Sequence, residues 1–211
     1  MTQRVAVLGV GQTRFGKRPE SRPEDLAHEA IRAAAADARI DLDDIDAVFA
    51  GSVQLHGGVG QRCVKEIGLV GIPIVNVENA CSSGSTAIRE AYAWLCAGFA
   101  DIAIAFGVES LSRSLAASGG KLLLDDFGDP FGSWMGMALP GLYAMEAMEY
   151  LHAHDAPREA IGHVSVKNRL NASLNPMAHQ QETVTLDEVL ASKMICDPLT
   201  LLECCPNSDG A

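Results

Sequence analysis

The first 110 residues alternate short apolar runs with longer stretches of helical spacing, and this alternation constrains the fold more than any other feature. The apolar runs, each ended by glycine or polar residues, lie at 4–10, 46–53, 72–79 and 101–110. Stretches with helical spacing lie between them, at 21–40, 58–69 and 82–98. Strands that alternate with helices of this length indicate a mostly parallel sheet flanked by helices. The predicted fold class is therefore α/β.

The character of the sequence changes after residue 110. Residues 111 to about 137 are rich in glycine, serine and aromatic residues, and helical spacing returns at 139–154 and 156–176. We expect an α/β core over 1–110 and a helical, partly irregular insertion, or loop domain, over 111–190. Residues 191–211 read as a return towards a last strand of the core. Because the sequence stops before that strand, we expect the chain to be incomplete.

Charge and composition exclude several classes of function. The 211 residues carry a formal net charge of −11, which argues against nucleic-acid binding because phosphate contacts need a basic face. No apolar run reaches the ~18 residues of a membrane span, and the N-terminus lacks the profile of a signal peptide. The six cysteines are scattered without a C-x-x-C pair, which favours a reducing compartment. We expect a cytoplasmic protein with no nucleic-acid, membrane or metal partner.

Cys81 is the residue whose sequence neighbours most directly indicate a catalytic role. It lies between a β-branched run and a helix, in IVNVENACSSGSTAIREAYAWL. A thiol at a helix N-terminus is close to unpaired backbone N–H groups and to the positive end of the helix dipole, and both favour the thiolate. The small residues after it leave room for an acyl carbonyl. The pattern favours nucleophilic acyl transfer, with a buried, inert thiol as the alternative.

Two neighbouring motifs resemble those of a known family. VENACSSGSTAI is similar to the nucleophile segment of the thiolase superfamily, in which a cysteine and small residues open a helix, and GFADIAIAFGVESLS is similar to the run that follows it. Later segments resemble thiolase-like acetyl-CoA acetyltransferases that pair with an OB-fold/zinc-ribbon partner, and also sterol-carrier-type thiolases. The resemblance covers essentially the whole chain. It implies a thiolase-like layered fold.

The resemblance implies a thiolase-type acyltransferase, an acetyl-CoA C-acyltransferase, with coenzyme A as substrate or product and no bound cofactor. Cys81 would take the acyl group during thiolysis of a 3-oxoacyl-CoA, or release it in the reverse condensation. Family members also use a histidine in a Gly-His-Pro motif and a second cysteine in a Cys-x-Gly motif. The first motif does not occur here, and the one Cys-x-Gly triplet, Cys96-Ala97-Gly98, ends the helical stretch after Cys81. These groups belong to a C-terminal half-domain in the family. We therefore expect an N-terminal half that is weakly active or inactive alone.

Two other functions stay open beside thiolysis. One is a thiolase-like retro-aldolase that acts on a steroid or aromatic side-chain CoA ester. The other is a non-catalytic subunit whose partner supplies the missing half. The resemblance further implies acyl-CoA as the small-molecule partner, a homodimer through the strand IPIVNVEN, and room for a small OB-fold/zinc-ribbon subunit.

Other candidate residues are assigned by their place relative to Cys81. Four residues at strand ends are expected to support the nucleophile loop: Glu78, Asn79, Glu109 and Ser110. For the first two of these, a helix cap or a dimer contact is the plainer role. The candidate substrate-binding residues are Gly84, His56 on a glycine-rich loop, Met135 and Met137. A methionine at helical spacing is also consistent with simple core packing, so both roles stay open for the methionines.

Overall fold

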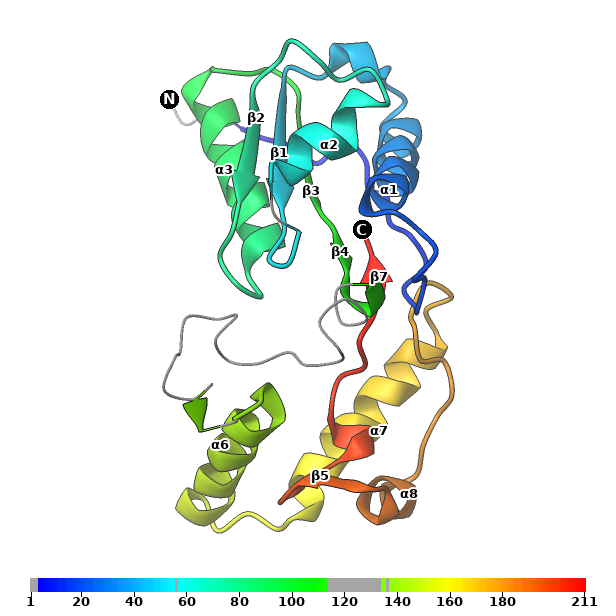
Figure 1. Cartoon of the computed structure of the whole chain (residues 1–211), viewed down its shortest axis with the longest axis vertical. Coiled ribbons are helices and arrows are strands. Elements are labelled where there is room, and N and C mark those ends of the chain that lie inside the picture. The colour runs from blue at the N-terminus through cyan, green and yellow to red at the C-terminus, as the bar shows by residue number, and fades with distance from the viewer. Residues whose placement is uncertain (1–3, 56, 114–133, 136) are drawn as a thin grey trace. The chain divides into compact units, whose positions relative to one another are not determined.

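The computed structural model describes residues 4–55, 57–113, 134–135 and 137–211. The chain divides into two units, one made of Met1–Ser114 with Ser208–Ala211 and the other of Leu115–Asn207. Figure 1 shows the elements of both units, and each unit is described by itself. The domain boundaries predicted at residues 110 and 190 stay a prediction.

A three-stranded parallel sheet forms the centre of the first unit. Its strands, in the spatial order β2-β1-β3, are β1 (Ala47–Gly51), β2 (Ile74–Val77) and β3 (Ala103–Gly107). Val48 lies opposite Ile74 on one side and Ile104 on the other. The helices of this unit are α1 (Pro23–Ala38), the 3-10 turn η1 (Leu42–Asp44), α2 (Val59–Lys65) and α3 (Ser83–Ala97). The strand–helix alternation of the sequence and the α/β class are confirmed.

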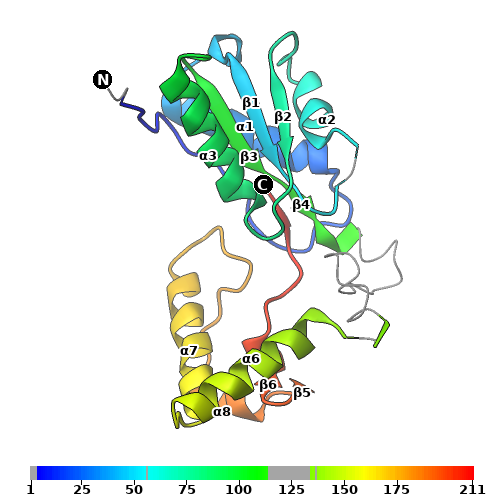
Figure 2. The same cartoon turned by 90° about the vertical axis from the view of Figure 1, so that its left-hand side faces the viewer.

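Helices cover both faces of this sheet, as Figures 1 and 2 show. Every residue of β1 is buried. Val48 and Ala50 face the core shared with α1 and α2, whereas Ala47 and Phe49 pack with residues of α3. A strand covered on both faces is apolar at every position. This is why the run at 46–53 shows no alternation of polar and apolar residues.

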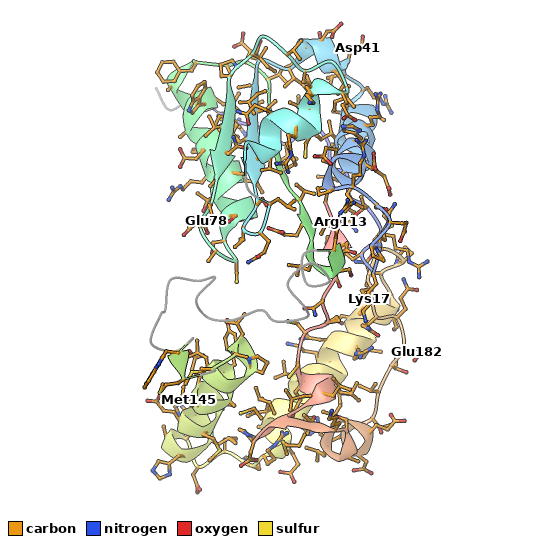
Figure 3. The ribbon with its side chains drawn as sticks, in the orientation of Figure 1. Lys17, Asp41, Glu78, Arg113, Met145 and Glu182 are labelled. Carbon is orange, nitrogen blue, oxygen red and sulfur yellow. The ribbon has the colours of Figure 1, made fainter. Side chains whose placement is uncertain are left out.

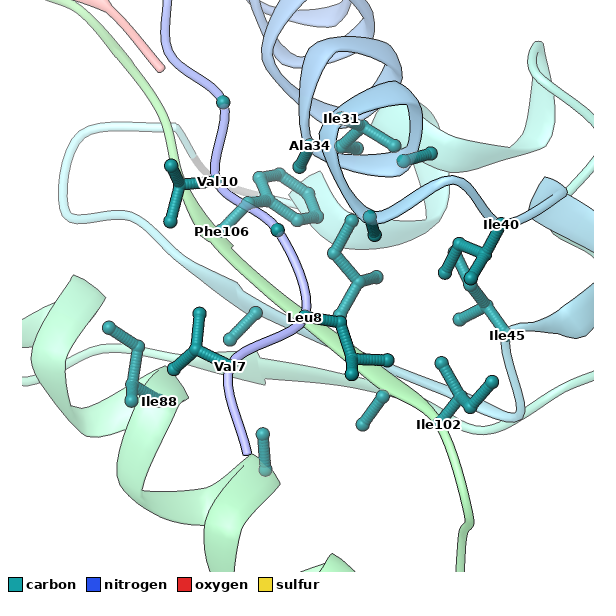
Figure 4. Close-up of a pocket in the computed structure, with 18 of the residues that line it drawn as sticks. Val7, Leu8, Val10, Ile31, Ala34, Ile40, Ile45, Ile88, Ile102 and Phe106 are labelled. Atoms are coloured by element: carbon teal, nitrogen blue, oxygen red, sulfur yellow. The ribbon is translucent and has the colours of Figure 1, made fainter. Parts of the chain in front are cut away.

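The strand predicted over residues 4–10 is wrong. These residues form neither helix nor strand, and Val7 and Val10 are 84% and 70% exposed. The segment lies against α1, where a Cβ added to Gly9 would lie only 2.4 Å from the backbone nitrogen of Ala38. A strand needs a neighbour that pairs with its backbone groups. A groove of about 480 Å³ lies between this segment and β3 (Figure 4), and no strand among the described residues pairs with the segment.

The C-terminal residues return to the first unit. β7 (Asp209–Gly210) pairs antiparallel with β4 (Glu109–Ser110). The fully buried carboxylate of Asp209 accepts hydrogen bonds from the backbone N–H of Arg18 at 2.6 Å and of Ser112 at 2.7 Å. A buried carboxylate is costly unless it is hydrogen-bonded in this way. Asp209 therefore ties three distant segments of the chain together.

The second unit is mainly helical. Its elements are α6 (Leu139–Ala153), α7 (Glu159–Ser173), α8 (Leu186–Ala191), β5 (Met194–Cys196), β6 (Leu199–Thr200) and the 3-10 turn η3 (Leu201–Glu203). α7 packs on α8 through Gly162, where an added Cβ would lie 2.7 Å from Leu186 Cδ1. The two helices predicted at 139–154 and 156–176 are confirmed as α6 and α7. Across the described parts of both units, no helix is long and apolar enough to cross a membrane.

Candidate active site

Cys81 lies in the short turn between β2 and α3. β2 ends at Val77 and α3 begins at Ser83, and Figure 3 labels Glu78 in this turn. Ala80 has a φ of 45°, in the left-handed region that residues other than glycine seldom adopt. The backbone therefore bends sharply just before the cysteine. The Cys81 thiol is free and exposed, which is not the buried thiol considered as the alternative.

Asn79 and Ser83 hold this turn in place. The backbone N–H of Asn79 donates to Ser83 Oγ at 2.8 Å, and Ser83 Oγ donates to the carbonyl of Ala80 at 2.7 Å. Asn79 Nδ2 donates to Thr86 Oγ1 at 2.9 Å in the first turn of α3. Ser83 is only 4% exposed, so its two bonds are shielded from water. The sequence indicated Ser83 only as a small residue, whereas in the structure its hydroxyl holds the turn through two hydrogen bonds.

Glycines let the sheet approach the start of α3. A Cβ added to Gly51, at the end of β1, would lie 2.7 Å from both the carbonyl carbon and the oxygen of Ser83. A Cβ added to Gly107, at the end of β3, would lie 3.6 Å from the Cα of Gly84. A Cβ added to Gly84 itself would meet no atom of the described residues within 4 Å. Open space therefore adjoins this predicted substrate-binding residue, and Gly51 is a positioning residue that sequence reasoning missed.

The predicted supporting glutamates hold two different loops. Glu78 Oε1 accepts a hydrogen bond from the backbone N–H of Ala80 at 2.7 Å, inside the Cys81 turn. Glu109 Oε1 accepts from three groups of the loop after β1: Ser52 Oγ, Val53 N–H and Gln54 N–H. Ser110 is fully buried, and its Oγ has no hydrogen-bond partner among the described residues. Support of the Cys81 turn by Glu109 and Ser110 stays a prediction.

The remaining candidates lie elsewhere in the chain. His56 is outside the described residues, so its predicted role is not addressed by the structure. Met135 and Met137 belong to the second unit, and their role in substrate binding stays a prediction. Within the described ranges, no group of three His, Cys, Asp or Glu side chains could hold a metal ion.

The other cysteines differ from Cys81 in their surroundings. Burial, with a smaller contribution from the negative charge of Glu24, raises the pKa of the Cys63 thiol to about 12. Cys63 therefore stays protonated near neutral pH. Burial also raises the pKa of Cys204. Cys205 is exposed like Cys81 but lies in a loop of the second unit, away from any helix start. It is a natural reference thiol for chemical tests.

Comparison with known proteins identifies the family. Residues 5–211 match the family described as "Thiolase, N-terminal domain". An acetyl-CoA acetyltransferase from Methanothermobacter thermautotrophicus is 36% identical over 98% of this chain and 55% of its own length. Sterol carrier protein 2 from Gallus gallus is 35% identical over 100% of this chain and 40% of its own length. The subunit BbsB of benzoylsuccinyl-CoA thiolase from Thauera aromatica is 33% identical over 100% of this chain and 54% of its own length.

A solved structure supports the same assignment. The Ltp2-ChsH2(DUF35) aldolase superposes with a TM-score of 0.82 at 26% identity, over 97% of this chain and 53% of that one. The chain spans about half the length of the acetyltransferase, of the thiolase subunit and of the aldolase chain. The sheet, the helices on both of its faces and the match over 5–211 agree with one another. The chain therefore belongs to the thiolase family and corresponds to its N-terminal domain.

Proposed function

We propose that this chain is the nucleophile-bearing half of a thiolase-type acyltransferase and that Cys81 accepts the acyl group. The observation that carries the proposal is an exposed thiol in a turn that Asn79 and Ser83 fix to the start of α3. Within the described residues, the backbone N–H groups of Gly84 and Ser85 in the first turn of this helix form no hydrogen bond. Unpaired N–H groups and the helix dipole stabilise an oxyanion that develops beside them.

The proposed step is an acyl transfer between two sulfur atoms. The Cys81 thiolate attacks the carbonyl carbon of an acyl-CoA, the carbon–sulfur bond to coenzyme A breaks, and coenzyme A leaves as a thiolate that takes up a proton. In thiolysis of a 3-oxoacyl-CoA, the bond between C2 and C3 breaks instead. Cys81 keeps the acyl group, and acetyl-CoA leaves after its carbanion gains a proton. Free coenzyme A then removes the acyl group from the sulfur.

We expect acylation without rapid turnover. A general acid or base beside the nucleophile typically speeds such a reaction roughly 10²–10⁴-fold. Within the described part of the chain, no side chain is hydrogen-bonded to the Cys81 sulfur. The chain alone therefore lacks this acceleration. The open space beside Gly84 lets the thioester approach. An acyl group should therefore be transferred to Cys81 once and remain there.

Mass spectrometry tests this proposal directly. The chain is mixed with acetyl-CoA, and acetyl adducts are counted on the intact protein and mapped by digestion. We expect one adduct on Cys81, its loss in Cys81→Ser, and its retention in Cys205→Ser, because Cys205 is also exposed but is not next to a helix start. An adduct shared equally by the two cysteines, or no adduct at all, would refute acylation at a specific nucleophile.

A retro-aldolase is the second candidate, because a solved structure named as an aldolase covers 97% of this chain. In that case, a 3-hydroxyacyl-CoA with a steroid or aromatic side chain would be cleaved without an acyl-cysteine. Incubation of the assembled complex with a 3-oxoacyl-CoA and free coenzyme A separates the two functions. Thiolysis that Cys81→Ser abolishes supports acyl transfer. Cleavage of the hydroxyacyl ester that survives Cys81→Ser supports the aldolase.

The assembly also belongs to the proposal. In the described part of the first unit, β2 is an edge strand with no neighbour on its outer side, which suits a homodimer formed by pairing of two β2 strands. The names of the related BbsB subunit and of the Ltp2-ChsH2(DUF35) aldolase suit a small partner subunit of OB-fold/zinc-ribbon type. A non-catalytic role remains for the chain if such a partner supplies the reacting groups. Native mass spectrometry of material from its source tests both contacts.

A further inference from the structure

Helix α6 in the second unit carries soft metal-ligating side chains on its exposed surface. Met145, Met148 and His152 are spaced i, i+3 and i+7 along this helix, and Figure 3 labels the first of them. At ~100° per residue, the spacing places all three within ~60° of the helix circumference. Side chains three and four positions apart on a helix are neighbours, with Cβ atoms about 5–6 Å apart. The two thioethers and the imidazole therefore form one stripe, called here the Met–His stripe.

The Met–His stripe does not lie on the packed side of the helix. α6 packs on β5 and β6, and its buried residue is Ala144. Met145 and Met148 are 51% and 49% exposed, and His152 is exposed as well. Methionine is among the residue types most often fully buried in folded proteins. Here, in contrast, both thioethers are open to an ion from solvent.

His152 is available as a ligand. Among the described residues it forms no hydrogen bond, ion pair or ring contact. A neutral imidazole keeps one ring nitrogen with a lone pair that can bind a metal ion. His154, at the C-cap of the same helix, differs because its ring packs against Tyr150 with 4.8 Å between centroids. It lies two residues from His152 and is therefore a matched control.

The charge around the Met–His stripe favours a cation. Glu149 follows Met145 by four positions and precedes His152 by three, so its carboxylate neighbours both. A negative charge at this distance attracts a cation and repels an anion. His152 also lies in the last turn of α6, where the negative end of the helix dipole adds to the attraction.

We propose that Met145, Met148 and His152 bind one soft monovalent cation, copper(I), with Glu149 as its counter-charge. Thioether and imidazole ligands suit copper(I), whereas Mg²⁺ and Ca²⁺ take oxygen ligands and Zn²⁺ takes Cys, His and carboxylate ligands. Clusters of three His, Cys, Asp or Glu that would hold such ions do not occur within the described ranges. Methionine has three rotatable bonds, so both thioethers can turn towards an ion that the imidazole holds.

Silver(I) is the probe for this site, because it shares the charge of copper(I) and its preference for soft donors and is stable in air. Thiolates bind soft ions more strongly than thioethers do, so the chain used carries Cys81→Ser and Cys205→Ser, which remove the two exposed thiols. NMR signals of the methionine methyl groups then report on each thioether separately. We expect the Met145 and Met148 signals to shift at lower silver(I) concentration than that of Met194, which is 52% exposed but lies on β5.

The two histidines give a matched pair of variants. Loss of a group that merely orients a ligand lowers metal affinity about 10–100-fold, and loss of the ligand itself should cost at least as much. His152→Gln should therefore weaken silver(I) binding at Met145 and Met148 by about tenfold or more. His154→Gln should leave it unchanged.

The double variant Met145→Leu/Met148→Leu gives a second measurement, because leucine keeps the apolar volume of both side chains. In this variant the ring signals of His152 should shift only at about tenfold higher silver(I) concentration. An equal response of Met194, or full affinity in His152→Gln, overturns the proposal. An equal loss in His154→Gln also overturns it, because the helix rather than a ligand would then account for the effect. A response of the His152 ring to zinc(II) at lower concentration than to silver(I) would assign the residues to a harder ion, with the same consequence.

Discussion

Replacement of Gly51 by alanine should distort the turn that carries Cys81, because the added methyl group displaces the start of α3. The added methyl group would lie 2.7 Å from the backbone carbon and oxygen of Ser83 and 2.9 Å from the nitrogen of Gly84. These are backbone atoms, so they cannot turn aside as a side chain does. Either β1 or the start of α3 must shift. Overpacking of this kind costs about 1–3 kcal/mol, which lowers Tm by roughly 2–12 °C for a chain of this size.

Two other glycines at the same place provide matched controls. A methyl group on Gly107 would lie 3.6 Å from Gly84 Cα, an ordinary contact, and one on Gly84 would lie in open space. Both residues lack the positive φ that would make alanine strained. Alanine at either position should be neutral or stabilise the fold by up to ~1 kcal/mol. Each variant adds the same single carbon, so only its location differs.

Thermal unfolding and Cys81 alkylation should be followed together. Trp94 reports on the first unit, because its ring packs edge-on against Phe49 at 5.4 Å between centroids, and a Trp134→Phe background removes the other tryptophan. Gly51→Ala should lower both Tm and the alkylation rate. Gly84→Ala should keep Tm but slow acylation by acetyl-CoA. If Gly51→Ala unfolds no earlier than Gly107→Ala, the close approach of β1 to α3 does not hold the site as argued.

Two further predictions concern stability. Phe49→Ala removes a fully buried ring and should cost about 3–5 kcal/mol in urea unfolding, and a loss under 1 kcal/mol would contradict the packing described. Burial alone would raise the pKa of Glu203, but hydrogen bonds from Arg158 and Thr200 lower it below the usual range. Because the folded pKa is the lower one, the ion pair stabilises the fold above about pH 4.3 and is lost as the pH falls through the folded value. Glu203→Gln should therefore weaken the pH dependence of Tm below pH 5, and an unchanged slope would argue against this role.

The sheet and its helices were predictable because their signals are local. β1 and β3 are short apolar runs. α3 ends at Ala97 and is capped by Gly98, whose φ of 74° suits the left-handed end of a helix. α8 went unpredicted although Thr185 and Glu188 form a capping box at its start, a pattern visible in the sequence. The short helix gave too few apolar positions for its period to stand out.

The features that failed or were missed depend on distant parts of the chain. Residues 4–10 have the composition of a buried strand, but a strand exists only where a neighbour offers a paired edge. The part played by Gly51 depends on how closely Ser83 approaches it, and spacing along the sequence carries no such information. Cys81 could be singled out as the candidate nucleophile because its motif is contiguous in the sequence. The role of the Ser83 hydroxyl could be seen only in the folded structure of the turn.

The free outer edge of β2 sets where the proposed dimer forms. An exposed edge with unpaired N–H and C=O groups tends to recruit another strand, and in the described residues β2 has no neighbour on its outer side. The Val48 N–H donates to the Pro73 carbonyl, and the Ser52 N–H donates to the Val77 carbonyl, so the odd-numbered residues of β2 face β1 and Ile74 faces the free edge. Ile74→Pro should therefore reduce the oligomeric mass measured by native mass spectrometry. Val75→Pro instead removes an N–H that faces β1, so it should lower Tm. If Ile74→Pro leaves the oligomeric mass unchanged, the dimer does not form through pairing of two β2 strands.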